Sequence, residues 1–297
     1  MTGIKKSKYN HPTGFDVFLY IFMALLALIT AFPFYYMVIV SFSNYTALHS
    51  QALYIWPTVF DTSSYRLVFT NNSFWSSVNT TLFITIIGTV LGVLFSVAAA
   101  YPLSKKEIPG NKLMFNIMIF TMFFSGGMIP GYLVVQQLGL GDSVWSMILP
   151  CLLGPFNIIL IKNYMEDLPA SIEESAKIDG ANDMTILFKI VLPMSTPIIA
   201  TIALFFAVSY WNSYYLGMLH IISKTKYPLQ LLLREILLDT TTSMTGMGAA
   251  LAAENKKVYS QALQMATVTI ATIPILVVYP FVQKYFTKGI MLGGVKG

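Results

Sequence analysis

Long stretches without a charged residue constrain this chain more than any other feature of its sequence. No Asp, Glu, Lys or Arg occurs within residues 67–104, 190–223 or 258–283. A typical soluble domain has about 25% charged residues, whereas this chain has 10% and is 56% hydrophobic. A spanning helix needs about 20 apolar residues, so these stretches are typical of membrane-spanning segments.

We therefore predict an all-α membrane protein with six transmembrane helices. The predicted spans are residues 15–40, 78–103, 113–135, 143–163, 194–217 and 260–283. The first span follows Lys5, Lys6 and Lys8, as a signal peptide would, but the apolar run from Phe15 to Phe42 is longer than a signal sequence needs. We predict that this helix is retained.

The distribution of Lys and Arg predicts the orientation. With the N-terminus inside, the inner segments contain twelve of the 18 bases: Lys5, Lys6, Lys8, Lys105, Lys106, Lys112, Lys162, Lys177, Lys189, Lys284, Lys288 and Lys296. The outer segments contain the other six: Arg66, Lys224, Lys226, Arg234, Lys256 and Lys257. Because positive charge favours the cytoplasmic side, both termini are predicted to be cytoplasmic.

Several kinds of chemistry have no signature in the sequence. There is no G-x-x-x-x-G-K-[ST] phosphate loop. His11, His49 and His220 are scattered, and Cys151 is alone, which favours a buried free thiol over a metal ligand or disulfide. The net charge of +5 comes from bases between the spans, not from a nucleic-acid-binding run. No Asp, Glu, Lys, Arg or His lies well inside a predicted span. This favours transport that is driven by an energy source outside this chain.

The inner loop, residues 164–193, contains the most specific pattern. Ser171 and Glu174 have the spacing of a capping box at a helix start. Glu173 lies near the same positive helix end, and Gly180 is placed to stop the helix in a left-handed conformation.

A second short helix is predicted over 183–191, with Met184, Leu187 and Val191 on one face and Pro193 at its exit. Two helices joined by a glycine elbow form a lever that a cytoplasmic partner could grip. The alternative is an amphipathic loop that lies on the membrane surface.

The loop resembles the cytoplasmic signature of permease subunits of bacterial ABC importers: E-A-A, three residues, G, nine residues, I-x-L-P. Here the pattern is Glu174-Ser175-Ala176, Gly180 and Ile190-Val191-Leu192-Pro193, with Ser175 in place of the usual alanine. Three further segments resemble the carbohydrate branch and the shorter permease of maltose-type importers: Asp179-Gly180-Ala181, Trp211-Asn212 and the tail from Lys288 to Gly297. The stretch from Phe124 to Pro130 resembles a polysaccharide and oligosaccharide subgroup.

The resemblance implies a division of the chain and a set of coupling residues. Residues 1–14 would be a cytoplasmic segment, 15–77 the first helix with an external loop, 78–287 the ABC-importer transmembrane domain, and 288–297 a cytoplasmic tail. The residues that match the family's ATPase-docking loop are Glu174, Ala176, Asp179 and Gly180. The tail, with Lys288 and Lys296, resembles the part that reaches the ATPase interface.

The implied partners are a second permease subunit, a cytoplasmic ATPase dimer, an extracytoplasmic solute-binding protein and membrane lipid, with no nucleic acid. ATP and magnesium would bind the ATPase, and this chain would bind no cofactor. The external segment 218–259 resembles the loop that meets the binding protein, with Thr245–Ala249 as a flexible stretch; an uninvolved solvated loop is the alternative.

An aromatic cluster near the outer end of the fifth span is a candidate substrate path: Tyr210, Trp211, Asn212, Tyr214 and Tyr215. Aromatic faces and amides suit sugar rings. An interfacial aromatic belt explains the same residues. The external bases fit an anionic substrate, and a solvated loop explains them equally well.

The third span contains Gly126, Gly127 and Pro130, which would break or kink it. A gating kink is one hypothesis, because broken helices often line transport paths, and ordinary membrane-helix composition is the other.

The sequence thus predicts a permease subunit of an ATP-driven oligosaccharide importer in a bacterial cytoplasmic membrane, without an ATPase site of its own. A self-sufficient secondary carrier or channel, and a membrane-anchored assembly or signalling protein, are the alternatives.

Overall fold

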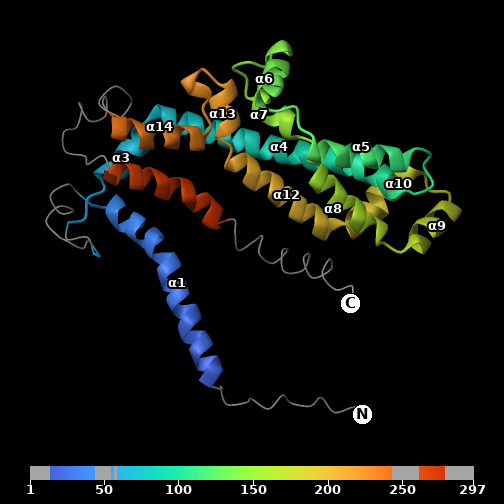
Figure 1. Cartoon of the computed structure of the whole chain (residues 1–297), viewed down its shortest axis with the longest axis horizontal. Helices are drawn as coiled ribbons and strands as arrows, with labels where there is room; N and C mark the ends of the chain where they lie inside the picture. The colour runs from blue at the N-terminus through green and yellow to red at the C-terminus, as the bar shows by residue number, and fades with distance from the viewer. Residues whose placement is uncertain (1–13, 44–54, 57–58, 243–260, 278–297) are drawn as a thin grey trace. The chain divides into compact units, whose positions relative to one another are not determined.

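The computed structural model describes four stretches of the chain: residues 14–43, 55–56, 59–242 and 261–277. Every regular element within these stretches is helical, in agreement with the predicted all-α class (Figure 1). The described residues fall into two compact units. One contains residues up to Val68 together with 261–270, and the other contains residues 69–242 together with 271–277.

The first unit contains α1 (Gly14–Ser41) and most of α3 (Ser63–Thr70). The second unit contains α4 (Asn72–Ser104), α5 (Asn111–Phe123), α6 (Met128–Gln137), α7 (Trp145–Ile148), η1 (Leu149–Cys151), α8 (Pro155–Glu166), α9 (Ala170–Ile178), α10 (Asp183–Ile186), η2 (Leu187–Val191), α11 (Leu192–Met194), α12 (Thr196–Trp211), α13 (Tyr215–His220), η3 (Lys224–Lys226) and α14 (Leu229–Thr242). A further apolar helix covers Gln261–Val277.

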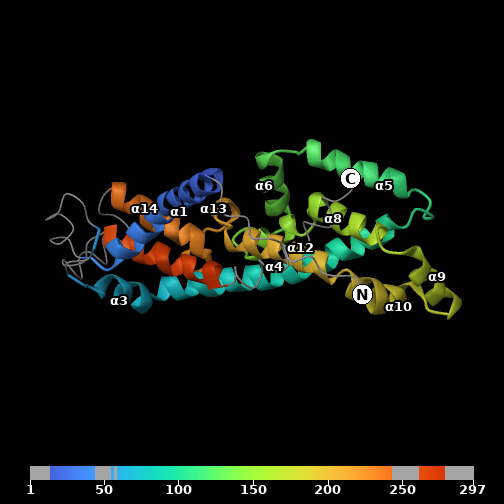
Figure 2. The same ribbon diagram turned by 90° about the horizontal axis from the view of Figure 1, so that it is seen from below.

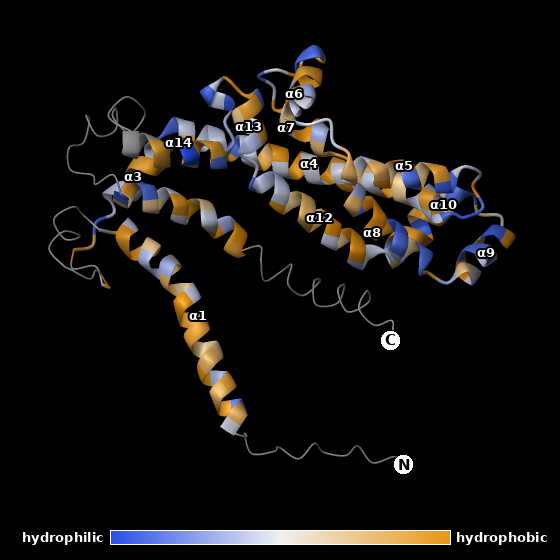
Figure 3. Ribbon diagram, viewed as in Figure 1, coloured by the Kyte–Doolittle hydropathy of each residue, from blue (hydrophilic) through white to orange (hydrophobic). Residues whose placement is uncertain are grey.

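Helix α1 is apolar along its length, which Figure 3 shows as a mainly orange ribbon. Its C-terminal end packs against the segment that follows. The ring of Phe42 stacks on Phe60 and Tyr65, with centroids 4.6 and 4.7 Å apart, and the hydroxyls of Ser41 and Tyr65 share a hydrogen bond of 2.6 Å. The rest of the helix has an apolar, exposed surface, as expected for a lipid-facing span.

The second unit is organised around α4. This helix has 33 residues and runs beside α12, as both views show (Figures 1 and 2). Gly88 and Gly92 make the close approach feasible, because a Cβ atom on Gly88 would lie 2.5 Å from the Tyr210 ring and one on Gly92 would lie 2.9 Å from the Phe206 ring. Small residues at a helix crossing are the usual way to bring apolar membrane helices together.

One hydrophobic core joins α4 to α8, α12 and the inner loop. Its fully buried members include Ala100, Ile161, Ile186 and Ile202. Because Ile186 comes from α10, the inner loop is anchored in the same core that holds the long helices. This anchoring fixes the position of the loop relative to α4, α8 and α12.

Two of the predicted spans, the third and the fourth, are bent pairs of helices, and the helix of the fifth, α12, forms a bent pair with the end of the inner loop. The pair α5 and α6 is bent by 113°, the pair from Trp145–Cys151 and α8 by 47°, and the pair from Asp183–Met194 and α12 by 81°. Two described helices, α1 and α4, are long and apolar enough to span a membrane alone, and the total rises to five if each bent pair counts as one span. The predicted third span, 113–135, is therefore not a straight helix, and the helix of the fifth ends at Trp211 rather than at residue 217.

We expect Gly88→Ala to destabilise the second unit, because the added methyl would push the Tyr210 ring out of the core. Overpacking of this kind costs about 1–3 kcal/mol. The melting temperature of the detergent-solubilised protein measures the effect. Gly131→Ala is the matched control, because Gly131 lies in α6 and a Cβ atom there would meet nothing within 4 Å. Equal melting temperatures for the two variants would contradict the close packing.

Candidate coupling surface and outer aromatic face

The first helix of the inner loop, α9, begins earlier than the sequence suggests. It covers Ala170–Ile178, and Pro169 is the N-cap, with no side-chain hydrogen bond to the helix start. The predicted capping box of Ser171 and Glu174 is therefore wrong. Pro169 is extended at the N-cap, with φ −61° and ψ 117°, so Ala170 is the first helical residue and Ser171 already lies inside the helix.

The glycine elbow after α9 is a complete Schellman motif. Gly180 has φ +83°, as predicted for a left-handed C-terminal glycine. The backbone N–H of Ala181 donates to the carbonyl of Ala176 at 2.9 Å, and that of Gly180 donates to the carbonyl of Lys177 at 3.0 Å. The two bonds satisfy the last carbonyls of α9 and fix the direction of the chain after it.

The second helix of the loop begins at α10, where the Asn182 side chain accepts a hydrogen bond of 2.8 Å from the N–H of Thr185. The helical path continues through η2, a π-helical turn, and α11 before the bend into α12. Of the three residues predicted to share one face of this helix, Leu187 and Val191 are buried and Met184 is exposed. Ile186 is also buried and belongs to the same core as Leu187 and Val191.

The tip of the loop presents apolar side chains outward. Ile178 is 86% exposed, and Met184 and Phe188 are also largely exposed. Helix α9 has no buried residue, so Glu174 and Asp179 are exposed as well, whereas Ala176 packs partly against the core. We call Ile178, Met184 and Phe188 the apolar tip. An exposed apolar group of this kind is typical of a surface that binds another protein.

An ion pair links the inner loop to the end of α4. Lys105, which caps the C-terminus of α4, pairs with the carboxylate of Glu173 in α9. The Lys105 ammonium also lies 4.8 Å from the centre of the Tyr101 ring. Sequence reasoning missed this pair, because Lys105 and Glu173 are far apart in the chain and no spacing rule connects them. The only indication of the pair in the sequence is that Lys105, a basic residue, directly follows an apolar span.

The candidate aromatic path divides into buried and exposed members. Tyr210 is 2% exposed, and its hydroxyl donates to the carbonyl of Ile148 at 3.1 Å, so in this structure it is a packing residue. Asn212 follows α12 and its amide donates to Val208 at 2.9 Å. Trp211 has a buried indole N–H without a hydrogen-bond partner among the described residues. Tyr214 and Tyr215 are exposed.

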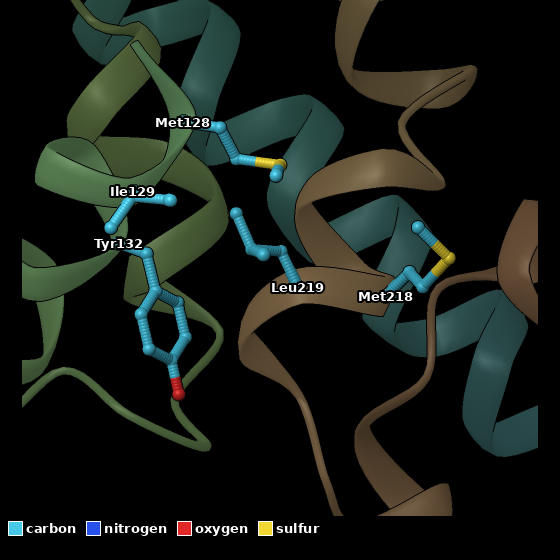
Figure 4. Close-up of a pocket in the computed structure, with 5 residues that line it drawn as sticks. All are labelled: Met128, Ile129, Tyr132, Met218 and Leu219. Atoms are coloured by element: carbon cyan, nitrogen blue, oxygen red, sulfur yellow. The ribbon is translucent and has the colours of Figure 1, made fainter. Parts of the chain in front are cut away.

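A shallow cavity of about 340 Å³ lies between α6 and α13. Figure 4 shows Met128, Ile129 and Leu219 pointing toward one another, with the Tyr132 hydroxyl directed away from them. The lining is mainly apolar. Within the described residues, no group of three or more His, Cys, Asp and Glu is arranged to hold a metal ion.

The break between α5 and α6 contains two of the residues proposed for a kink. Gly126 and Gly127 lie between the helices, Gly127 has φ +85°, and Pro130 is in the first turn of α6. A gating role for this break stays a prediction. Lys288, Lys296 and the stretch 245–249 lie outside the described residues.

The turn before α7 is clasped to the segment after α13 by Asp142. Its carboxylate accepts hydrogen bonds from the N–H groups of Ile222 and Ser223, both at 2.9 Å, and from the Ser223 hydroxyl at 2.6 Å. Lys226 pairs with the same carboxylate at 3.0 Å. The bonds from Ser223, followed by those from Lys226 and Ile222, hold the pKa of Asp142 well below its usual range. This clasp joins two turns that are distant in sequence.

We expect Asp142→Asn to lower the melting temperature, because the clasp loses its ion pair and one acceptor. A folded-state pKa below the unfolded value makes this stabilisation fully present above the ordinary carboxyl pKa and removes it only as the pH falls. The difference in melting temperature between wild type and variant should therefore be constant from about pH 5 to 8. A difference that changes strongly across this range would contradict the assignment.

Comparisons with known proteins agree with this architecture. No family model matches the chain. The polygalacturonan/rhamnogalacturonan transport system permease protein YtcP of Bacillus subtilis is 43% identical over 95% of this chain and 98% of its own length. Protein LplC of the same organism is 43% identical over 97% of this chain and 98% of its own.

A solved structure is also similar throughout. A chain from a bacterial ABC transporter involved in the import of the acidic polysaccharide alginate matches with a TM-score of 0.86 and 35% identity, over 92% of this chain and 96% of that one. Sequence identity of this level over nearly the full length of the relatives shows that this chain shares both their fold and their family. The chain therefore belongs to the membrane-spanning permease subunits of bacterial ABC importers for polysaccharides and oligosaccharides.

Proposed function

We propose that this chain is one of two permease subunits of an importer for acidic oligosaccharides, and that a cytoplasmic ATPase drives it through α9 and α10. The observation that carries the proposal is the exposed apolar tip on a loop that is anchored in the core. A partner that binds the tip can displace the loop. Because the loop is anchored in the core that it shares with α4, α8 and α12, its displacement also moves these helices. Glu174, Asp179 and Gly180 shape and surround the docking surface.

The proposed topology has six spans with both termini in the cytoplasm. The five spans that the described helices support, together with the apolar helix Gln261–Val277, are consistent with six. The excess of Lys and Arg in the inner segments supports the orientation. In this topology α9 and α10 face the ATPase, and α13 and α14 face the outside, where a solute-binding protein would deliver the sugar.

The proposed substrate class is a uronate-containing oligosaccharide. One relative is named for polygalacturonan and rhamnogalacturonan, and the matching solved structure is described as importing alginate, an acidic polysaccharide. Both relatives match nearly the whole chain. ATP and magnesium would bind on the ATPase, and the tail with Lys288 and Lys296 would add a second contact with it.

Substitution of the apolar tip tests the proposal. In Ile178→Glu a charge replaces an apolar contact at the ATPase interface, which should lower the amount of co-purifying ATPase by about tenfold or more. The measurement is quantitative co-purification from detergent with a tag on this chain. Ile222→Glu is the matched control, since Ile222 is 82% exposed but lies on the proposed outer side.

The Ile222 variant should retain its ATPase. The proposal fails if Ile178→Glu also retains the ATPase, or if the wild-type chain purifies alone and moves sugar unaided, as a self-sufficient carrier would.

Charge reversal tests the link between α4 and α9. Lys105→Glu and Glu173→Lys should each lower the sugar imported per ATP hydrolysed, because like charges would separate the loop from α4. Contacts that carry such coupling contribute about 0.5–2 kcal/mol, or about 2- to 30-fold. The double variant should recover most of the loss.

The exposed pair Lys177 and Asp183, at 3.8 Å, is the control for this experiment. Reversing it should change the ratio little, because exposed ion pairs contribute about 0–1 kcal/mol. The two pairs lie in the same loop, so a general disturbance of the loop would affect both. Failure of the Lys105–Glu173 double variant to recover would contradict a direct link.

A further inference from the structure

The guanidinium of Arg234, on α14, makes only uncharged contacts among the described residues. It lies over the ring of Tyr214, 5.9 Å from its centre, and one of its N–H groups points at the sulfur of Met218 at 3.1 Å. Tyr214 and Met218 come from the segment of α13, which packs beside α14 (Figure 1). Arg234 is exposed, and none of the carboxylates whose side chains the structure describes pairs with it.

The neighbouring bases differ from Arg234 in this respect. Lys224 pairs with Glu235, and Lys226 pairs with Asp142. Glu235 is the acidic residue next to Arg234 in sequence, but its carboxylate is used by Lys224. Among the side chains that the structure describes, two of these three cations thus have an acidic partner, and the third, the guanidinium of Arg234, has none.

The open guanidinium and the tyrosine ring together match the chemistry of a uronate sugar. A guanidinium presents parallel N–H groups that bind a carboxylate in a bidentate manner. An exposed aromatic face packs on the apolar face of a sugar ring. Tyr214 is exposed, and Tyr215, the next residue in the sequence, is exposed as well.

We propose that Arg234 and Tyr214 form a subsite on the outer face of the permease that binds the carboxylate and ring of a uronate residue as it enters. Arg234 is then a specificity-determining residue that favours acidic over neutral oligosaccharides. This inference rests on the proposed function and on its topology. An anionic lipid headgroup offers the same chemistry from a second source, and the experiment below separates the two.

The experiment compares trigalacturonate with its methyl ester, which has the same sugar rings without the negative charges. The complex is purified through a tag on this chain, reconstituted in vesicles of neutral phosphatidylcholine, and supplied with ATP and the binding protein. Arg234→Gln should lower the rate of trigalacturonate uptake about tenfold or more, because charge-assisted hydrogen bonds are lost. Uptake of the methyl ester should change less than twofold.

Two variants complete the design. Arg234→Lys should recover part of the rate, since it keeps the charge but loses the bidentate geometry. Lys224→Gln, a second base of the same segment that already has an internal partner, should leave the preference for the acid unchanged.

Three outcomes would overturn the subsite. Equal losses for acid and ester in Arg234→Gln would mean that the residue is structural. An Arg234→Gln defect that appears only in vesicles containing phosphatidylglycerol would assign the guanidinium to lipid phosphate. Unchanged uptake of the acid would exclude Arg234 from its path. If the wild-type complex imports neither sugar, the proposed substrate class fails instead.

Discussion

The close contact between α4 and α12 is the constraint on which the rest of the second unit depends. In a membrane, apolar surface alone does not drive helices together, so the packing of surfaces must do so. Gly88 and Gly92 let the rings of Tyr210 and Phe206 lie directly on the α4 backbone. Tyr210 extends this contact to the carbonyl of Ile148, which brings in the segment before α8.

The contact between α4 and α12 also determines the position of the inner loop. It lies between α8 and α12 in the chain, both of which pack on α4. Ile186 and Val191 insert into the shared core, and the Lys105–Glu173 pair ties α9 to the end of α4. A force applied to the apolar tip therefore reaches all three helices. The Schellman turn at Gly180 fixes the direction of the elbow, which is what the proposed coupling role requires of the loop.

The end of the unit that contains α13 and η3 is built differently. There, hydrogen bonds to Asp142 hold two turns together. Arg234 lies on this framework with its charge unused by any described carboxylate. In the proposed topology, the inner end thus offers an apolar surface to a protein partner, and the outer end offers aromatic rings and a cation to a sugar acid.

Much of this arrangement can be predicted from the sequence, and the features that cannot be predicted are missed for physical reasons. Charge-free runs predict the apolar helices, and Gly180 predicts its own left-handed turn, because both signals are local. Helix bends and pair contacts are not local: nothing in the sequence near Tyr210 indicates that Gly88 leaves room for its ring. That Leu187 and Val191 are buried while Met184 is exposed depends on the core formed with distant helices, which the local pattern does not contain. Lys105 and Glu173, between which the chain forms α5 to α8, could not be paired without the fold.

The most direct measurement of the central claim is photo-crosslinking from position 178 in intact membranes. A photoreactive amino acid placed there should form an adduct with a cytoplasmic ATPase, and the same group at position 222 should not. The yield of the ATPase adduct should change between the nucleotide-free and ATP-bound states, because the loop moves with its partner. An adduct with lipid alone, or with a protein on the outer side, would contradict the assignment of α9 and α10 as the coupling element.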